Sequence, residues 1–278
     1  MIESMKAEET KFLYKVLSAI RRNLEDFVLV GGFASFLYQF HEHAKPIGVS
    51  PLLTYDIDLA SGGKVSVRGG KTVHQSLSEI ELIEEFTGTC TPPLVKYFPK
   101  DKTPPMYVEF LTPLRGSEDK RGISDVTQKI QPDLSAQKLR FLDLLLKKPW
   151  TISTSSVPGL EKHPNLVVKI PHPSMFIMQK ILISGRRADK SRAKDFAYIY
   201  QVLGFFRDDW EVLAKQYEVL IDNPEWRRWY RKFIRMSMQL FDTPEKDGPI
   251  EASRIIPQAT PEMISAAVNR FMSACPKI

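Results

Sequence analysis

Two aspartates separated by one residue, Asp56 and Asp58, are the clearest chemical signal in the sequence. Residues 54–60 alternate polar and apolar side chains, which is typical of a strand with one hydrophilic face. Because side chains alternate along a strand, both carboxylates are expected on the same side, roughly 6–7 Å apart. The two carboxylates repel each other unless a cation lies between them. Hard oxygen ligands of this kind suit Mg²⁺ with bound phosphates. Alone, the pair is a weak signal, because many surface strands contain it.

A Gly-Gly pair upstream strengthens the interpretation. Gly31 and Gly32 follow the apolar run 27–30 and precede the helix-like segment 33–41. A turn of this kind between strand and helix presents backbone N–H groups and a helix N-terminus to an anion. Together with the aspartates, it indicates a site for a metal ion and a triphosphate.

A third acid, Glu109, interrupts the otherwise apolar strand predicted at 106–111. A glutamate in such a setting is costly unless it is paired or binds a metal. The alternative is an edge strand with Glu109 facing water. In the metal interpretation, the three carboxylates share one face of the sheet and converge on a common point.

The elements that must position these residues follow from hydrophobic periodicity. The first half of the chain reads as α/β and the second half as helical. Helices are expected at 5–24, 33–41, 76–86, 135–147, 173–183, 193–206, 210–221, 224–241 and 261–274, and strands at 27–30, 54–60, 95–98, 106–111 and 166–170. The fold class is therefore α/β (α+β), with a mixed-sheet domain at 1–171 and a helical domain at 172–278.

Composition sets the outer limits. The chain has 278 residues, of which 43% are hydrophobic and 26% charged, so disorder and fibrous folds are excluded. Two distant cysteines, Cys90 and Cys275, argue against a disulfide framework. Without a signal pattern or a membrane-length apolar run, we expect a cytoplasmic protein with no membrane partner.

Positive charge is concentrated in the second half. The net charge is +6, and residues 172–278 carry 17 Lys/Arg against 13 Asp/Glu. One side of the helix predicted at 224–241 is basic. This side is either a solvated helix face or a surface that binds phosphates. The basic loop that contains Arg186 and Arg187 is either a solvated linker or a surface that meets triphosphate or RNA.

At this point the sequence resembles a family. LVGG, TYDIDLA and YVEFLTPLRG are similar to the nucleotidyltransferase fold of the DNA polymerase β superfamily. The downstream segments resemble a bacterial nucleotidyltransferase-like family related to the AbiEii and MenT toxin nucleotidyltransferases: AQKLRFLDLLL, VVKIPHPSMFIMQKILISGRR and SRAKDFAYIYQVL. The resemblance covers roughly residues 28–203.

The resemblance implies roles for the matching residues. Gly31 and Gly32 would cradle nucleotide phosphates, and Asp56 and Asp58 would hold Mg²⁺ as cofactor. Glu109 would be the third metal-binding carboxylate and would activate the attacking hydroxyl.

The resemblance extends to the helical half. Lys180 matches a lysine of the toxin-like relatives and Asp195 the acid that follows it. An ammonium beside the β- and γ-phosphates would offset charge as pyrophosphate leaves. The alternative for Lys180 is a helix lysine whose amine reaches solvent. Toxin-type relatives often carry arginine four residues before the first aspartate, where this chain has Leu52, which weakens the toxin interpretation.

The sequence therefore predicts an Mg²⁺-dependent transfer of a nucleoside monophosphate from an NTP to a hydroxyl acceptor. The acceptor is RNA, a protein or a small molecule, and the basic helical half favours RNA. Two rivals stay open. One is a non-catalytic nucleotide- or RNA-binding module, which the complete set of three acids disfavours. The other is a toxin that acts with an antitoxin partner.

Overall fold

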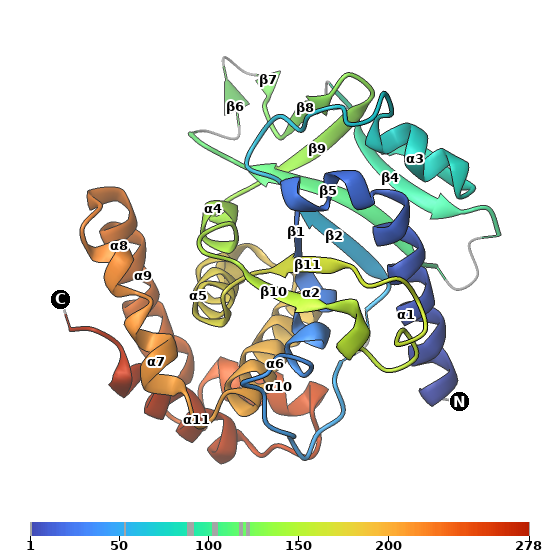
Figure 1. Ribbon diagram of the computed structural model, residues 1–278. Coiled ribbons are helices and arrows are strands. Elements are labelled where there is room, and N and C mark those ends of the chain that lie inside the picture. Colours follow the sequence, from blue (N-terminus) through green and yellow to red (C-terminus); the bar gives the residue numbers. More distant parts are fainter. Residues whose placement is uncertain are drawn as a thin grey trace. The chain divides into compact units, whose positions relative to one another are not determined.

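The computed structural model describes residues 2–52, 54–87, 92–101, 105–116, 119–120 and 123–277. They form two units, drawn in Figure 1. One unit comprises Met1–Phe40 and Leu53–Pro171, and the other comprises His41–Leu52 and His172–Ile278. The first is a mixed α/β unit and the second is helical, so the predicted fold class is confirmed. The division into two domains at Pro171 stays a prediction.

A mixed sheet forms the centre of the first unit, with seven strands among the described residues. Its order is β1–β2–β5–β4–β3, and β9 pairs with β5 and with β8. β5 runs parallel to β2 and to β9, and the other neighbours are antiparallel. The strands are β1 (Val28–Val30), β2 (Asp56–Ala60), β3 (Leu82–Thr87), β4 (Leu94–Pro99), β5 (Tyr107–Pro113), β8 (Thr127–Gln131) and β9 (Leu134–Leu139).

Helices and two short ribbons complete this unit. α2 packs on β1 and β2, and α1 packs on α3. The helices are α1 (Ile2–Ala19), η1 (Arg21–Asp26), α2 (Gly31–Tyr38), α3 (Val73–Glu79), α4 (Leu142–Leu145) and η2 (Thr154–Ser156). The ribbons pair β6 (Asp119–Lys120) with β7 (Ile123–Ser124), and β10 (Trp150–Ser153) with β11 (Val167–Ile170).

The core of the unit lies against the apolar face of the central strands. Ile57 and Leu59 are buried on β2, and Val108 and Phe110 on β5. The Phe110 ring packs against the Phe27 ring with centroids 5.4 Å apart. Burial of side chains of this size stabilises the fold by about 1.5–3 kcal/mol each, so the strands that carry the acids are firmly held.

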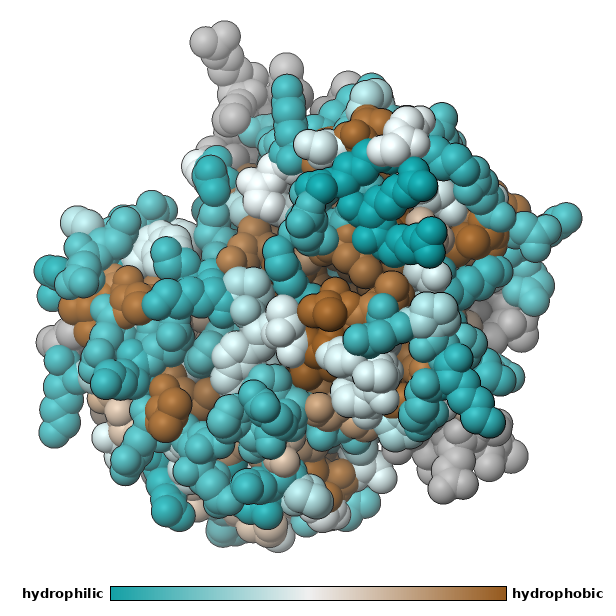
Figure 2. Space-filling model, in the orientation of Figure 1, coloured by the Kyte–Doolittle hydropathy of each residue, from teal (hydrophilic) through white to brown (hydrophobic). Residues whose placement is uncertain are grey.

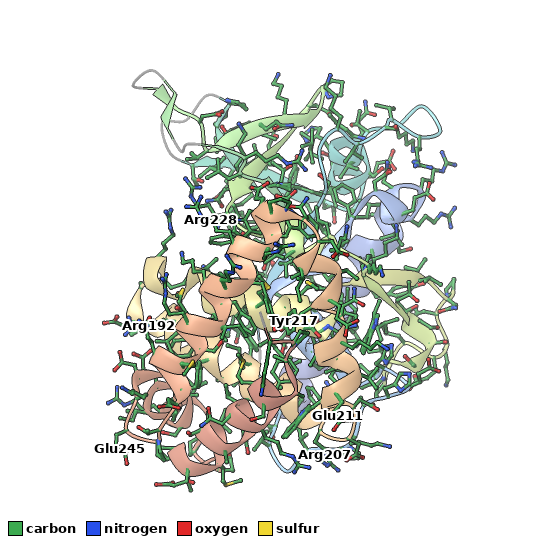
Figure 3. The ribbon with its side chains drawn as sticks, turned by 90° about the vertical axis from the view of Figure 1, so that its left-hand side faces the viewer. Arg192, Arg207, Glu211, Tyr217, Arg228 and Glu245 are labelled. Carbon is green, nitrogen blue, oxygen red and sulfur yellow. The ribbon has the colours of Figure 1, made fainter. Side chains whose placement is uncertain are left out.

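The second unit is a set of helices around buried aromatic residues. The Tyr217 ring lies 5.3 Å from Tyr230 and 5.2 Å from Phe233, and its hydroxyl donates to Ser174 O at 2.8 Å. Figure 3 shows Tyr217 inside this unit. The helices are α5 (Pro173–Ile183), η3 (Ser184–Arg186), α6 (Asp189–Phe205), α7 (Trp210–Lys215), α8 (Glu218–Ile221), α9 (Pro224–Phe241), α10 (Asp247–Ile255) and α11 (Pro261–Ala274).

The loop between α2 and β2 belongs to this helical unit. Lys45 N donates to Phe205 O at 2.7 Å, and Gln201 Nε2 donates to Ser50 O at 2.8 Å. Both hydrogen bonds are made with residues of α6. Residues 41–52 are therefore held by a helix that is distant from them in the sequence.

Two of the predicted helices contain residues that form strands instead. The helix predicted at 76–86 ends at Glu79, because Glu81 has a positive φ of 61° and the following residues pair with β4. The helix predicted at 135–147 begins instead as strand β9, which pairs with β5 and β8, and α4 is the helical part of this range. In both segments, strand pairing decides the structure over local helical periodicity.

Candidate active site

Gly31 and Asp58 meet where β1 passes into α2. Val30 pairs with Asp58 across the two strands, and Gly31 follows at a φ of +66°. A Cβ on Gly31 would lie 1.9 Å from Asp58 Oδ2. Only glycine fits both the backbone angle and the approach, so the Asp58 carboxylate lies directly against the first turn of α2.

The strand register places the three predicted acids on one face. β2 and β5 are parallel, with Asp58 opposite Glu109 and Asp56 opposite Tyr107. Residues that pair across neighbouring strands point to the same side of the sheet, and so do residues two apart on one strand. Asp56, Asp58 and Glu109 therefore share a face, as the sequence predicts. Asp58 is buried, and Asp56 and Glu109 are partly exposed.

A lysine extends this row on the next strand. Lys96 of β4 pairs with Glu109, and its Nζ lies 3.4 Å from Glu109 Oε2. The same ammonium lies 3.9 Å from the centroid of the Tyr107 ring. Burial opposes the charge of Lys96, but Glu109 and Tyr107 outweigh it and raise the pKa of Lys96 above its ordinary value. Lys96 is therefore a fixed positive charge beside the third acid.

Tyr107 lies close to two of the acids. Burial, together with the Asp56 and Glu109 carboxylates, raises its pKa. The phenol thus stays protonated at neutral pH and can donate a hydrogen bond on the acidic face.

The donor atoms suit Mg²⁺, which prefers carboxylate oxygens. Among the residues that the structure describes, however, no group of three or more His, Cys, Asp or Glu side chains is arranged to hold a metal ion. Glu109 is paired with Lys96, and Asp56 Oδ1 accepts a hydrogen bond from the Thr54 hydroxyl. The predicted common face is present, and the convergence of the three carboxylates on one point stays a prediction.

Lys180 and Asp195 form a buried ion pair in the helical unit. Lys180 Nζ lies 2.5 Å from Asp195 Oδ1, and the two side chains are 5% and 4% exposed. The rings of Phe176 and Tyr198 lie 5.4 and 5.6 Å from the ammonium. Lys180 thus does not reach bulk solvent, contrary to the alternative of a solvent-reaching lysine.

The basic loop beside this pair contacts it through Arg187. Arg187 Nε donates to Asp195 Oδ2 at 3.0 Å, so the carboxylate is shared between two cations. Arg187 is 43% exposed in its side chain, and Arg186, at the end of η3, is exposed as well. Nucleotide binding by Gly31, Gly32, Lys180, Arg186 and Arg187 stays a prediction.

Sequence reasoning missed Lys96. The signal was available in the alternation of strand 95–98, where Val95 and Tyr97 face the core and Lys96 faces the other side. What was missing was the pairing of this strand with the Glu109 strand, which only the sheet order supplies.

A mixed sheet with acids on two neighbouring parallel strands, beside a glycine turn that opens a helix, is the arrangement that the resemblance to nucleotidyl-transferring proteins implies. Residues 12–221 match a family described as nucleotidyltransferase, and the chain belongs to this family. Members of this class transfer nucleoside monophosphate groups and take NTPs as substrates. α9, α10 and α11 lie beyond the matched residues.

Two other comparisons add no relatives. Neither the curated proteins nor the solved structures contain a match to the chain. In the part of the chain that the structure describes, no helix combines the length and the apolar character needed to cross a membrane.

Proposed function

We propose that this nucleotidyltransferase moves a nucleoside monophosphate from an NTP to a hydroxyl acceptor with Mg²⁺ as cofactor. The observation that carries the proposal is the position of Asp58, which lies against Gly31 on one side and opposite Glu109 on the other. The N-terminus of a helix favours phosphate groups, and neighbouring carboxylates favour a metal ion. A carboxylate that lies between a helix start and a second acid therefore suits a site for a metal ion and a triphosphate.

Asp56, Asp58 and Glu109 would hold Mg²⁺, which when bound stabilises the negative charge of the phosphates. The N–H groups of Gly31 and Gly32 are suited to donate to phosphate oxygens at the start of α2. In the reaction, the acceptor oxygen bonds to the α-phosphorus and the bond to the bridging oxygen breaks, so pyrophosphate leaves. The acceptor proton passes to Glu109.

Lys180 would supply positive charge to the leaving pyrophosphate, with Asp195 fixing its position. The 2.5 Å bond between the two supports the orienting role of Asp195. Arg186 and Arg187 would add further charge from the adjacent loop.

RNA is the acceptor that the helical unit favours. Arg228, Arg231 and Arg235 follow each other at helical spacing on α9, and all three are exposed. They form no ion pair within the described residues. Arg228 lies on the outer side of the unit in Figure 3. A row of uncompensated guanidinium groups suits a phosphodiester backbone.

The test is incubation of the purified protein with each labelled NTP, Mg²⁺ and total RNA. Labelled RNA that is formed by the wild type and not by Asp58→Asn supports the proposal. Label on a protein or on a small molecule would identify that molecule as the acceptor in place of RNA. Binding of NTP without any product would favour a non-catalytic module. A toxin role would require growth arrest on expression that Asp58→Asn abolishes and a co-expressed antitoxin relieves.

A further inference from the structure

A basic pocket in the α/β unit shares no residue with the acidic face. It lies between α1, η1, the turn at 68–71 and α3, and its volume is about 590 Å³, within the range of small-molecule sites. Its lining includes one acid, Glu79, and six basic residues: Lys11, Lys15, Arg21, Arg22, Arg68 and Lys71. In Figure 2, strongly hydrophilic side chains gather near the C-terminal end of α1.

Two of the six cations are neutralised. Arg68 donates to both oxygens of Asp26 at 3.1 Å and also pairs with Glu25. Lys71 Nζ lies 2.6 Å from Glu79 Oε1. The acids that meet these two cations are thus already engaged.

The other four cations lack an acidic partner within the described residues. They are Lys11 and Lys15, one helical turn apart on α1, and Arg21 and Arg22 on η1. Four uncompensated positive charges around one cavity repel each other, which costs stability unless an anion enters.

Arg22 is held in position before any ligand binds. Its Nη1 donates to Gly69 O at 3.2 Å. A Cβ on Gly69 would lie 1.8 Å from this nitrogen, and Gly69 has a φ of +60°. Glycine at position 69 therefore lets the guanidinium lie close against the turn, which reduces the entropy lost when it binds an anion.

An aromatic pair forms another part of the wall. The rings of Tyr14 and His163 have centroids 4.5 Å apart, and the Tyr14 hydroxyl donates to Pro164 O at 2.9 Å. Tyr14 is buried and His163 is exposed. The exposed imidazole therefore lies at the edge of the cationic cavity.

We propose that this pocket binds a small anion with two or more linked phosphates, such as inorganic polyphosphate or the phosphate chain of a nucleotide. The negative charges of such an anion complement the four cations that lack an acidic partner. This site lies outside the residues of the proposed catalytic function and does not depend on that function.

The test is calorimetric titration with sodium tripolyphosphate in EDTA, which removes metal-dependent binding. The key variant combines Lys11→Gln, Lys15→Gln and Arg21→Gln. A matched control combines Lys64→Gln, Lys100→Gln and Lys129→Gln, three exposed lysines of the same unit outside the pocket. We expect saturable binding to the wild type, at least about a tenfold weaker affinity in the pocket variant and less than about a twofold change in the control.

One further variant locates the binding within the molecule. Gly69→Ala keeps every charge but displaces Arg22, and we expect it to weaken binding about fivefold. Its thermal melt, beside that of Gly70→Ala, corrects for backbone strain, since Gly70 also has a positive φ but no close neighbour.

Parallel titrations with ATP distinguish the sources of the phosphate chain. Tighter binding of ATP than of tripolyphosphate, lost in His163→Ala, supports a nucleotide, and equal binding supports inorganic polyphosphate. No saturable binding to the wild type, or equal losses in the two triple variants, overturns the proposal. So does a single-stranded RNA that binds the pocket more tightly than either small anion, because it would make this face a polymer surface.

Discussion

The Asp58 carboxylate occupies the space where any side chain on Gly31 would begin, with Oδ2 1.9 Å from the ideal Cβ position. The two residues are therefore linked: the acid can lie against the start of α2 only because position 31 has no side chain. This relationship is a direct way to test the site without removing a charged group.

Gly31→Ala should reduce kcat/KM at least about tenfold, because the new methyl group displaces the Asp58 carboxylate. It should also lower the free energy of unfolding by about 1–3 kcal/mol, because alanine is strained at a φ of +66°. Gly159→Ala is the matched control, since Gly159 has a φ of +86° and open space around its Cβ position. A variant Gly31→Ala with full activity would show that the position of Asp58 is not critical.

Lys96→Met should tighten Mg²⁺ binding severalfold in a calorimetric titration without nucleotide. Lys96 lies 3.4 Å from Glu109 Oε2, and its positive charge opposes a metal ion on the same carboxylate. Lys100→Met, in the turn just beyond β4, controls for the loss of one charge. Weaker Mg²⁺ binding in Lys96→Met would instead mean that Lys96 holds Glu109 in its metal-binding position.

Lys180→Met should lower kcat/KM by at least about tenfold, on the order of 1.4 kcal/mol, if the ammonium meets the phosphates. The sequence alone predicts little loss of stability. The structure changes that expectation, because the 2.5 Å pair with Asp195 is almost fully buried. We now expect the free energy of unfolding to fall by about 1–3 kcal/mol, since Arg187 still pairs with the carboxylate.

Lys180→Arg separates the effect on activity from the effect on stability, because it keeps the positive charge and changes the position of the charged group. Stability that recovers while activity stays low would support a role for the ammonium at the phosphates. Recovery of both in parallel, or an unchanged kcat/KM in Lys180→Met, would leave Lys180 with a structural role only.

The protein should lose stability as the pH rises above about 9. Burial raises the pKa of the Cys275 thiol to about 12, and it raises the pKa values of Tyr217 and Tyr230 as well. Above the ordinary thiol pKa of about 8.5 the unfolded chain releases this proton while the folded chain keeps it, so the free energy of unfolding falls with pH. One such group contributes a slope of up to about 1.4 kcal/mol per pH unit.

Chemical denaturation at pH 8, 9 and 10 measures this slope. Cys275→Ala should be less sensitive to pH than the wild type, because it lacks the buried thiol. Equal slopes in the two proteins would place Cys275 in contact with water.

The residues of the acidic face could be predicted from sequence because each carries its own local signal. Asp56 and Asp58 lie in an alternating strand, and Glu109 interrupts an apolar one. Their shared face also follows, although the parallel pairing that puts Glu109 beside Asp58 depends on the sheet order. Lys96 could not be assigned, because its partner is set by a neighbouring strand and not by its own segment.

The fold shows the same limit. The amphipathic helix α9 agrees with its predicted range of 224–241. Its two signals, the apolar stripe and the proline at the first helical position, Pro224, both lie within the segment itself. β9 has helical periodicity, yet it forms a strand between β5 and β8. Where long-range strand pairing competes with local helical preference, the pairing partner determines the secondary structure. The sequence of the segment alone does not identify that partner.

Asp58 is the residue on which the proposed nucleotidyl transfer most depends. Its most direct test is the rate of label transfer from each α-labelled NTP to total RNA, with Mg²⁺, in the wild type and in Asp58→Asn. We predict measurable transfer by the wild type and a loss of at least about a hundredfold in the variant. The variant should also melt at the same or a higher temperature, because repulsion from Asp56 and Glu109 is relieved. A correctly folded Asp58→Asn protein that transfers label at the wild-type rate would contradict the proposed role of Asp58.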